Sequence, residues 1–587
     1  MLEGGTGNMA KLNVITAFWI GLIAPSVAAA CGGFFCNAQP VDQQAERIIF
    51  VQEDENTVTS YVEIQYQGAP DAFAWIVPVP AVPDLDTWQS MSFNALDLVT
   101  EPQWNFQDDC FFLEADAPAA NRAGEDGGDP VIVLDQRRVG PFDTVTLQSA
   151  DPRELVQWLR DNEYRIIPAM EPFIALYTAE NMKFLAMKLA PGEDTDSIQP
   201  IKMTYTAANP AIPLRLTAVA AQLEMGVKVW ILGDQKYGAR NVPDIAIGDD
   251  EVVMDFNRWE NNYLPLVARK VDAAGGKGFV TELAEPTERL VEMVRDSVVP
   301  DRVGQEGIDA RDALAELLAS KPYITRLYTR LSPEEMDIDP IFERIDGPDV
   351  SNIHVIESER NAEEENLCDN GELPEVDACA FEACGAGGRC AELDQAQGQQ
   401  RAGCACVDGT IARAGFDPQG RQIVSCGDAR IDFSSAPMDS GQIQFPDLCS
   451  SGNFCGQNGE CLTLNGFPAC RCQQGFVAIP NIDAQGMLTP TCVASTAANM
   501  LDLSSIELRE PNLPYPGRVT AMDPMPVDMV DDQMDMTQEP IDPATRPQGM
   551  MTSSGSGGGC QSHGPQSGSL WMLMVLIGLW RVRKAKL

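Results

Sequence analysis

Apolar and polar positions alternate along the first part of the chain in the manner of β-strands. Arg47–Gln52 is a short apolar run that ends at a turn-forming stretch, and Val58–Gln67 alternates apolar with polar side chains. The same two patterns recur further along, and they predict strands at Ala72–Val77, Val131–Leu134, Val139–Leu147, Lys183–Leu189, Ile201–Thr206, Leu214–Ala220 and Val227–Leu232. The chain therefore begins with a β-rich domain.

Helical patterns are fewer than strand patterns. One helix is predicted to begin at Asp151-Pro152 and to end near Asn162, and two more are predicted at Glu288–Ser297 and Ala310–Ser320. The strand Ala72–Val77 runs into three residues that lack a backbone N–H, which are Pro78, Pro80 and Pro83. That strand is expected at a sheet edge or in an extended run, because proline cannot donate to a neighbouring strand. Strands and helices together predict an α+β domain.

The sequence changes after residue 360, where an acidic stretch leads into a cysteine-rich region. Thirteen of the 17 cysteines lie between Cys368 and Cys492. Apart from Cys368 they form two runs of six, which are Cys379, Cys384, Cys390, Cys404, Cys406, Cys426 and Cys449, Cys455, Cys461, Cys470, Cys472, Cys492. Segments this short cannot bury a self-sufficient apolar core, so disulfides are predicted to replace it. Zinc binding is the alternative, but the C-x2-C pairs and histidines that zinc sites favour are missing from both runs.

The second run, with Asn465-Gly466-Phe467 just ahead of Cys470-Arg471-Cys472, resembles the epidermal-growth-factor-like (EGF-like) module. The resemblance implies pairing of the first cysteine with the third, the second with the fourth and the fifth with the sixth. Six cysteines alone would allow 15 connectivities. The first run fits the template less closely, because 13 residues separate Cys390 from Cys404. We predict a linker and first EGF-like module in residues 361–426, a linker in 427–448 and a second module in 449–492.

Cysteines outside the two runs are harder to assign. Cys31, Cys36, Cys110 and Cys368 form an even set, and all three of its pairings stay open. Cys31 follows a stretch that is typical of a signal peptide, residues 1–30, whose small residues before position 31 suit cleavage. Simple cleavage is favoured over lipidation of Cys31, because Ala28 stands where lipoproteins usually carry leucine.

The sequence at the end of the chain predicts a disordered stalk followed by a cell-surface sorting signal. Residues 493–559 are rich in proline, aspartate and methionine with little patterned hydrophobicity, which predicts a disordered stalk. In residues 560–587, Cys560 precedes a short hydrophobic helix, Leu570–Trp580, and a basic terminus. This order resembles the myxobacterial-type C-terminal sorting tag, which implies processing near Cys560 and display on the cell surface. A tail anchor that contacts the membrane is the alternative, although about a dozen apolar residues cover only about 20 Å of a ~30 Å bilayer core.

The composition of the chain limits which partners and catalytic mechanisms are plausible. The formal net charge of −45 excludes nucleic acid as a partner, because a phosphate backbone would be repelled. With two histidines, His354 and His563, the usual triads and metal hydrolases lack their base, and His354 is expected to be a surface or hydrogen-bonded residue. A carboxylate pair stays open among 86 acidic residues. No cofactor and no catalytic residue is assigned, and calcium stays open without a position.

Several motifs of the first domain resemble, in order, a bacterial secreted family known only as a domain of unknown function, the 2330 family. They are Ala72–Pro80, Trp158-Leu159 with Tyr164, Phe184–Leu189, Gly275-Gly276 with Phe279–Glu282, Tyr323–Arg330, Ser332–Met336 and Asp339-Pro340. The resemblance covers residues 31–360 and implies an exported β-rich domain. It implies no activity and no site.

The predicted chain is multidomain. It has a β-rich (α+β) N-terminal domain, two small disulfide-rich EGF-like modules, a disordered stalk and a short C-terminal hydrophobic helix. The hypothesis for function is a binding or adhesion protein, exported to the cell surface or outer envelope of a Gram-negative bacterium. Its partner would be an envelope or extracellular protein or glycan. The alternatives are an exported carboxylate-dependent hydrolase with the modules as stalk, and a structural component of an envelope assembly.

Overall fold

The computed structural model describes residues 43–63, 73–106, 133–164, 166, 168–219, 221–255, 258, 260–297, 300–356, 376–397, 400–417, 420–428, 449, 453–464, 467–483, 487–506, 508 and 513. The chain divides into two units, Met1–Val519 and Thr520–Leu587, and every described residue belongs to the first. The predicted signal peptide, most of the predicted stalk and the segment 560–587 lie outside the described residues. So do Cys31, Cys36, Cys110, Cys368 and Cys560.

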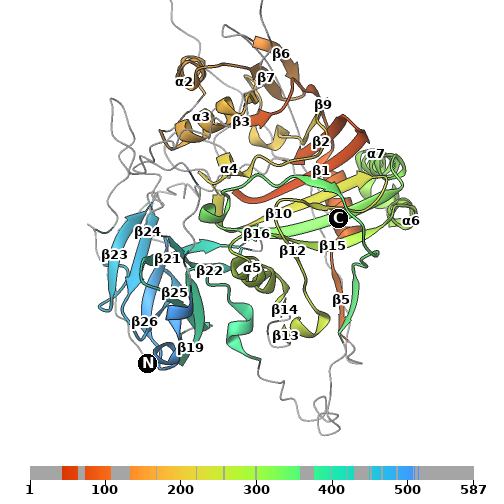
Figure 1. Cartoon of the computed structure of the whole chain (residues 1–587). Coiled ribbons are helices and arrows are strands. Elements are labelled where there is room, and N and C mark those ends of the chain that lie inside the picture. Colours follow the sequence, from red (N-terminus) through yellow and green to blue (C-terminus); the bar gives the residue numbers. More distant parts are fainter. Residues whose placement is uncertain are drawn as a thin grey trace, which may run out of the picture. The chain divides into compact units, whose positions relative to one another are not determined.

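An eight-stranded mixed sheet forms the centre of the N-terminal domain (Figure 1). In spatial order its strands are β12 (Asp244–Ile245), β15 (Phe279–Pro286), β16 (Tyr323–Leu331), β10 (Ala221–Gly233), β1 (Gln43–Asp54), β2 (Thr57–Glu63), β9 (Ile201–Thr206) and β4 (Asp84–Thr87). The central strands β1 and β10 run parallel, with Ile48 opposite Val229. β2 and β16 flank this pair and are antiparallel to it. The predicted β-rich character of the domain is confirmed.

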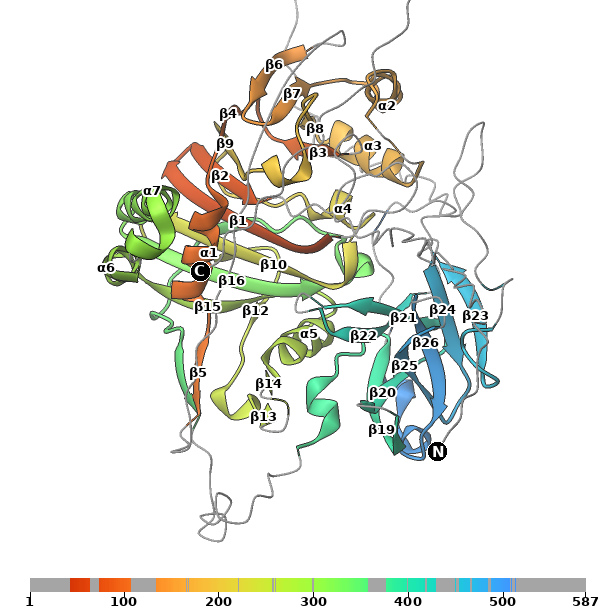
Figure 2. The same ribbon diagram turned by 180° about the vertical axis from the view of Figure 1, so that it is seen from behind.

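The two faces of this sheet carry separate cores because successive residues of a strand point to opposite sides. On β1, Ile49 and Val51 belong to one buried cluster, whereas Ile48 and Phe50 belong to another. Helices α1 (Ser90–Thr100), α6 (Glu288–Ser297) and α7 (Pro300–Ala319) complete the first cluster together with side chains of the neighbouring strands, and Figure 2 shows these helices grouped beside the sheet. We call this side the helix face and the opposite side the pocket face.

A smaller sheet contributes to the core on the pocket face. Its strands are β3 (Ala74–Val79), β8 (Lys183–Leu189), β7 (Phe142–Leu147) and β6 (Val133–Val139), in that order. β3 is an edge strand and contains Pro78, as the run of prolines predicts. Helices α2 (Pro152–Asp161) and α3 (Glu171–Ala179) supply further residues of the same core. Asp151 caps α2 by accepting from the Arg153 N–H, at the predicted start.

The hydrophobic patterns in the sequence predicted some secondary-structure elements wrongly and did not predict others. The predicted strand Leu214–Ala220 is wrong, because Leu214–Thr217 forms the short helix α4 after Pro213. Leu214 and Leu216 are both buried, and a single turn is too short to show a 3.6-residue period. Helix α5 (Tyr263–Ala273) was not predicted. The remaining N-terminal strands form two-stranded ladders, which are β5 (Gln103–Phe106) with β18 (Ile353–Ile356), β11 (Tyr237–Ala239) with β17 (Phe342–Arg344), and β13 (Met254–Asp255) with β14 (Glu260–Asn261).

Six disulfides cross-link the cysteine region. They join Cys379–Cys390, Cys384–Cys404, Cys406–Cys426, Cys449–Cys461, Cys455–Cys470 and Cys472–Cys492. Both runs therefore pair first with third, second with fourth and fifth with sixth, in the order that the EGF-like resemblance implies. The structure supports a disulfide-rich region, and ten of the twelve cysteines lie in or against one cluster that takes the place of an aliphatic core.

Strands of the two runs share their sheets. The strands are β19 (Gly388–Gln397), β20 (Gln400–Cys406), β21 (Thr410–Phe416) and β22 (Gln422–Asp428) from the first run, and β23 (Gly459–Leu464), β24 (Phe467–Cys472), β25 (Phe476–Ile482) and β26 (Leu488–Ala494) from the second. One sheet has the order β19-β20-β25-β26 and the other β22-β21-β24-β23. The two predicted modules thus form one interleaved region. Two short 3-10 helices, Ala497–Met500 and Leu503–Ser505, extend it past the predicted boundary at residue 493.

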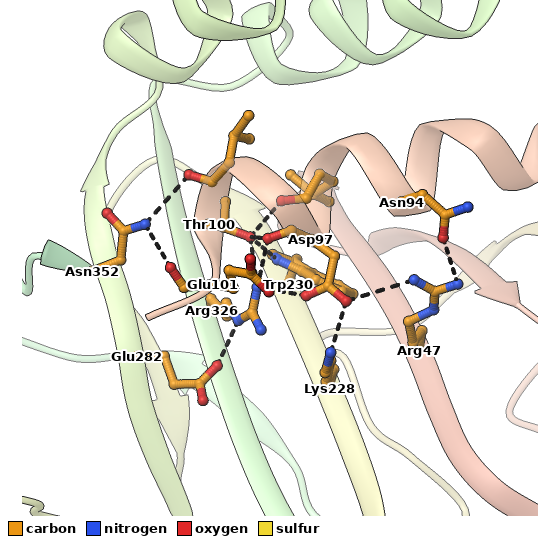
Figure 3. A network of polar contacts seen from close by, with 12 residues as sticks. Arg47, Asn94, Asp97, Thr100, Glu101, Lys228, Trp230, Glu282, Arg326 and Asn352 are labelled. Atoms are coloured by element: carbon orange, nitrogen blue, oxygen red, sulfur yellow. Dashed lines mark hydrogen bonds and ion pairs between the residues drawn. The ribbon is translucent and has the colours of Figure 1, made fainter. Parts of the chain in front are cut away.

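A buried ionic network ties α1 to the sheet on the helix face (Figure 3). Asp97 of α1 forms ion pairs with Lys228 of β10 at 2.7 Å and with Arg326 of β16 at 2.8 Å. Arg326 also donates to Glu282 of β15 at 2.5 Å, and both side chains of that pair are 2% exposed. Thr100 accepts from Arg326 and from the Trp230 indole, both at 2.9 Å. Three strands and one helix therefore meet at one guanidinium group.

Among the described residues, no helix is long and apolar enough to cross a membrane.

Loss of the Arg326 guanidinium should destabilise the N-terminal domain strongly. Arg326→Met leaves the buried Glu282 carboxylate without its ion-pair partner, and breaking such a pair costs about 3–5 kcal/mol. Arg344→Met is the matched control, because the Arg344–Asp234 pair is 44% and 57% exposed and should contribute no more than about 1 kcal/mol. Urea denaturation followed by tryptophan fluorescence measures both. Equal losses from the two substitutions would contradict the structural role of this network.

Candidate functional site

A cavity of about 240 Å³ opens on the pocket face of the eight-stranded sheet. Ile48 and Phe50 of β1 line it, together with side chains of β2 and β9. Residues 75–80 of β3 and the following turn line it from the smaller sheet, and parts of the segment 207–217 complete it. The cavity is larger than a cavity of about 150 Å³ that takes up benzene in another protein. It is therefore large enough for a small organic molecule.

The lining of this cavity is mostly apolar. Its largest side chains are those of Phe50, Trp75, Tyr205, Met182 and Met203. Among the described residues that line it there is no lysine, arginine or histidine. Because β3 is an edge strand whose proline lacks an N–H, this wall offers fewer backbone donors than an ordinary strand edge. Contacts with a ligand would therefore be made mainly by side chains.

Glu46 of β1 places a carboxyl group in this apolar lining. Glu46 is 8% exposed, and the Oε2 atom of its carboxyl has no hydrogen-bond partner among the described residues. Burial raises the pKa of Glu46 to about 7. Near neutral pH the carboxyl group therefore exists in both forms, as a neutral donor and as an anion without a counter-charge.

Asp339 is the other carboxylate of the cavity, and its oxygens are fully engaged. It accepts from the Tyr177 hydroxyl at 2.9 Å, from the Arg215 backbone N–H at 3.0 Å and from the Arg215 guanidinium at 2.6 and 2.8 Å. Burial raises the pKa of Asp339, and its bonds to Arg215 oppose that shift. Asp339 thus positions Arg215 and Tyr177, whereas Glu46 keeps an oxygen for a ligand.

A second group of carboxyls is buried away from the cavity. Burial raises the pKa values of Glu224 of β10, Asp272 of α5 and Glu335 of a 3-10 turn, Pro333–Glu335, and the nearby Glu224 raises those of Asp272 and Glu335 further. Glu224 is fully buried at a positive φ of 55°, and neither of its carboxyl oxygens has a partner among the described residues. Its backbone conformation follows from the irregular pairing of β1 with β10, whose register jumps from Gln43–Ala221 to Ala45–Gly226.

The cysteine region contacts the group of Glu224, Asp272 and Glu335, which we call the carboxyl cluster. Arg413 of β21 pairs with Glu334, next to Glu335, and Arg330 and Arg413 both lower the pKa of Glu224. Burial is nevertheless the larger effect, and it raises the pKa of Glu224 to about 7 and that of Glu335 to about 8. Gly276 packs on this cluster at φ 70°, where a Cβ would come within 2.5 Å of the Glu335 Cγ.

The sequence-based candidates are distributed over several places. His354 lies on β18, where its Nδ1 is 2.8 Å from Asp249 and its ring stacks on Trp104 at 4.2 Å, so it is a partnered histidine. The twelve cysteines of the two runs form the disulfides described above. Among the described residues no group of three or more His, Cys, Asp or Glu side chains is arranged to hold a metal ion. Calcium therefore receives no position.

The sequence patterns did not identify Glu46 as a candidate, because it directly precedes the apolar run of β1 and resembles an ordinary first residue of a strand. The two-residue period of a strand contains the missing information, since Glu46 has the same parity as Ile48 and Phe50. Recognising it would have required knowledge of which face is hollowed.

Comparisons with known proteins assign the first domain to a family. The model of a family described as an uncharacterized protein conserved in bacteria (DUF2330) matches residues 25–341, just over half of the 587-residue chain. No curated protein matches the chain. The crystal structure of a mutated baculovirus P35 after caspase cleavage matches 33% of this chain and 69% of its own, with 12% identity and a TM-score of 0.19. That score is too low to support a shared fold.

The carboxyl cluster should make stability depend on pH near neutrality. A carboxyl whose folded pKa is raised stabilises the folded state fully below its unfolded pKa, and this contribution is lost as pH rises through the folded pKa. Because Glu224 and Glu335 have an ordinary pKa of 4.5 in the unfolded chain and pKa values of about 7 and 8 in the folded protein, the melting temperature should fall as pH rises from about 4.5 to about 8. Glu335→Gln should flatten the profile, because the amide cannot ionise.

The control for this profile is Glu292→Gln on the exposed side of α6, which should leave the wild-type slope unchanged. Differential scanning fluorimetry across the pH range measures all three proteins. A profile for Glu335→Gln as steep as that of the wild type would show that this cluster does not control the pH dependence.

Proposed function

Since the chain belongs to the DUF2330 family of uncharacterized bacterial proteins, we propose that it is an exported binding protein of the bacterial envelope that takes a small, largely apolar ligand into its N-terminal domain. The observation that carries this proposal is the cavity on the pocket face, with one incompletely bonded carboxyl, Glu46, in an apolar lining. Concave apolar sites with few polar groups are the usual form of small-molecule sites.

The cysteine region supports the location. Six disulfides are typical of a protein that folds in an oxidising compartment, and they support a location outside the cytoplasm. The signal peptide and sorting tag inferred from residues 1–30 and 560–587 favour display at the cell surface of a Gram-negative bacterium. In this proposal the EGF-like modules act as a spacer. They also offer the surface for the predicted protein or glycan partner of the envelope.

A hydrolase is the second candidate, because two carboxylates, Glu46 and Asp339, line the same cavity. A glycosidase needs one carboxyl as acid and another as base or nucleophile. Asp339 is unsuited to either role while Arg215 and Tyr177 occupy its oxygens. The apolar lining also lacks the many polar groups that a sugar requires. Binding without chemistry is therefore the better-supported function.

Filling the cavity should abolish uptake of small aromatic probes. Ala207 lines the cavity, so Ala207→Trp should reduce the affinity for indole and for 2-phenylethanol at least tenfold. Ala208→Trp is the matched control, since the neighbouring residue is exposed and does not line the cavity. Isothermal titration calorimetry on the full chain measures both variants, and their melting temperatures report on folding.

Equal affinity of the two tryptophan variants for these probes would place binding outside the cavity and overturn the proposal. Absence of binding to the wild type would also overturn it. Turnover of a glycoside that depends on Glu46 would instead favour the hydrolase.

A further inference from the structure

We infer that the cavity is built for an organic ammonium ion, an amine with an apolar body whose charged nitrogen lies against the Glu46 carboxylate. This inference rests on the proposed function, and it adds the chemical class of the ligand. No ligand class follows from the family to which the chain belongs.

The first argument is charge. Among the described residues, Glu46 is the one carboxyl of the cavity with an oxygen that lacks a partner, and no cationic side chain lines the cavity. An ionised carboxylate in an apolar surrounding is costly unless it is paired. An ammonium ion supplies the missing counter-charge, and the ion pair is strong because little water separates the partners.

The second argument is the aromatic lining. Phe50, Trp75 and Tyr205 contribute rings to the same cavity as Glu46. Phe50 lies four residues from Glu46 along β1, and the strand register places Tyr205 level with Gln52, so these two rings border the part of the cavity that would hold the apolar body of the ligand. A carboxylate toward one end of the cavity and rings farther along it suit an amine whose body is apolar or aromatic.

The third argument is exclusion. An anionic ligand would find no positive side chain in the lining and would face Glu46 and Asp339, on a chain of net charge −45. A sugar would find few hydrogen-bonding groups. A neutral apolar ligand would fit the walls but would leave Glu46 either protonated or unpaired. The ammonium ion is the class that uses both the walls and the carboxyl.

Calorimetry with two probes of equal shape tests the inference. Phenethylamine and 2-phenylethanol share one body and differ in an ammonium versus a hydroxyl group. At pH 7.5 the wild type should bind phenethylamine at least tenfold more tightly than 2-phenylethanol. Glu46→Gln should remove this preference, reducing the affinity for the amine at least tenfold and leaving that for the alcohol within about twofold. Glu53→Gln, an exposed carboxylate on the same strand, should change neither affinity.

Proton release provides an independent readout. Below its pKa of about 7, Glu46 carries a proton that it must give to solvent when the ammonium ion binds, so amine binding releases up to one proton. The affinity for phenethylamine should fall as pH is lowered from 8 to 5.5, while that for 2-phenylethanol should not fall. Titrations in buffers of different ionisation enthalpy measure the released proton, and Glu46→Gln should release none.

The outcomes separate the two levels of the proposal. Binding of 2-phenylethanol as tight as that of phenethylamine, or an amine affinity that Glu46→Gln leaves unchanged, overturns the ammonium inference and keeps the cavity as a binding site. Binding of neither probe overturns both. Retained affinity for 2-phenylethanol shows that the Glu46→Gln cavity is folded, so a loss of amine binding alone supports the inference.

Discussion

The parallel pairing of β1 with β10 is the constraint on which the N-terminal domain depends. These strands lie at the centre of the eight-stranded sheet, and each must present apolar side chains to both faces. Ile49 and Val51 pack in the core that the sheet shares with α1, α6 and α7, and Ile48 and Phe50 pack in the core on the opposite face. The irregular start of this ladder turns Glu224 inward and is followed at once by Glu46. One strand pair thus sets the helix layer, the carboxyl cluster and one wall of the cavity.

Polar groups are treated differently on the two faces. On the helix face, Arg326 meets Glu282, Asp97 and Thr100, and Asp97 also meets Lys228, so a dense set of charges is mutually compensated (Figure 3). Such a network fixes the position of α1, which has no side-chain N-cap of its own. On the pocket face and at Glu224, some carboxyl oxygens have no hydrogen-bond partner within the described part of the chain. Compensation holds the fold together, whereas the uncompensated carboxyls mark places that respond to protons or ligands.

Periodicity predicted the parts of the fold that local physics decides. Strands Lys183–Leu189 and Ile201–Thr206 and helix Glu288–Ser297 have the predicted bounds, because alternation or helical spacing persists through each. Helix α3 escaped prediction because it is apolar on most sides. The cysteine spacing indicated disulfides and, through the EGF-like resemblance, their order, but it could not show that β20 pairs with β25 and β21 with β24 across the two runs. Long-range pairing also builds the cavity, so its lining could not be derived from local sequence.

Adjacent residues of β1 show why the cavity calls for an explanation beyond stability. Arg47 points to the helix face, where it pairs with Glu63 and Asp97 and donates to Asn94. Glu46, one position earlier, points to the other face, where its Oε2 atom has no partner among the residues that the structure describes. The strand needs only an apolar residue there, since Ile48 and Phe50 continue the same row. A buried carboxyl costs stability unless it is bonded, and the same burial raises the pKa of Glu46 to about 7. A ligand that completes the bonding of Glu46 offsets this cost, which the fold alone does not.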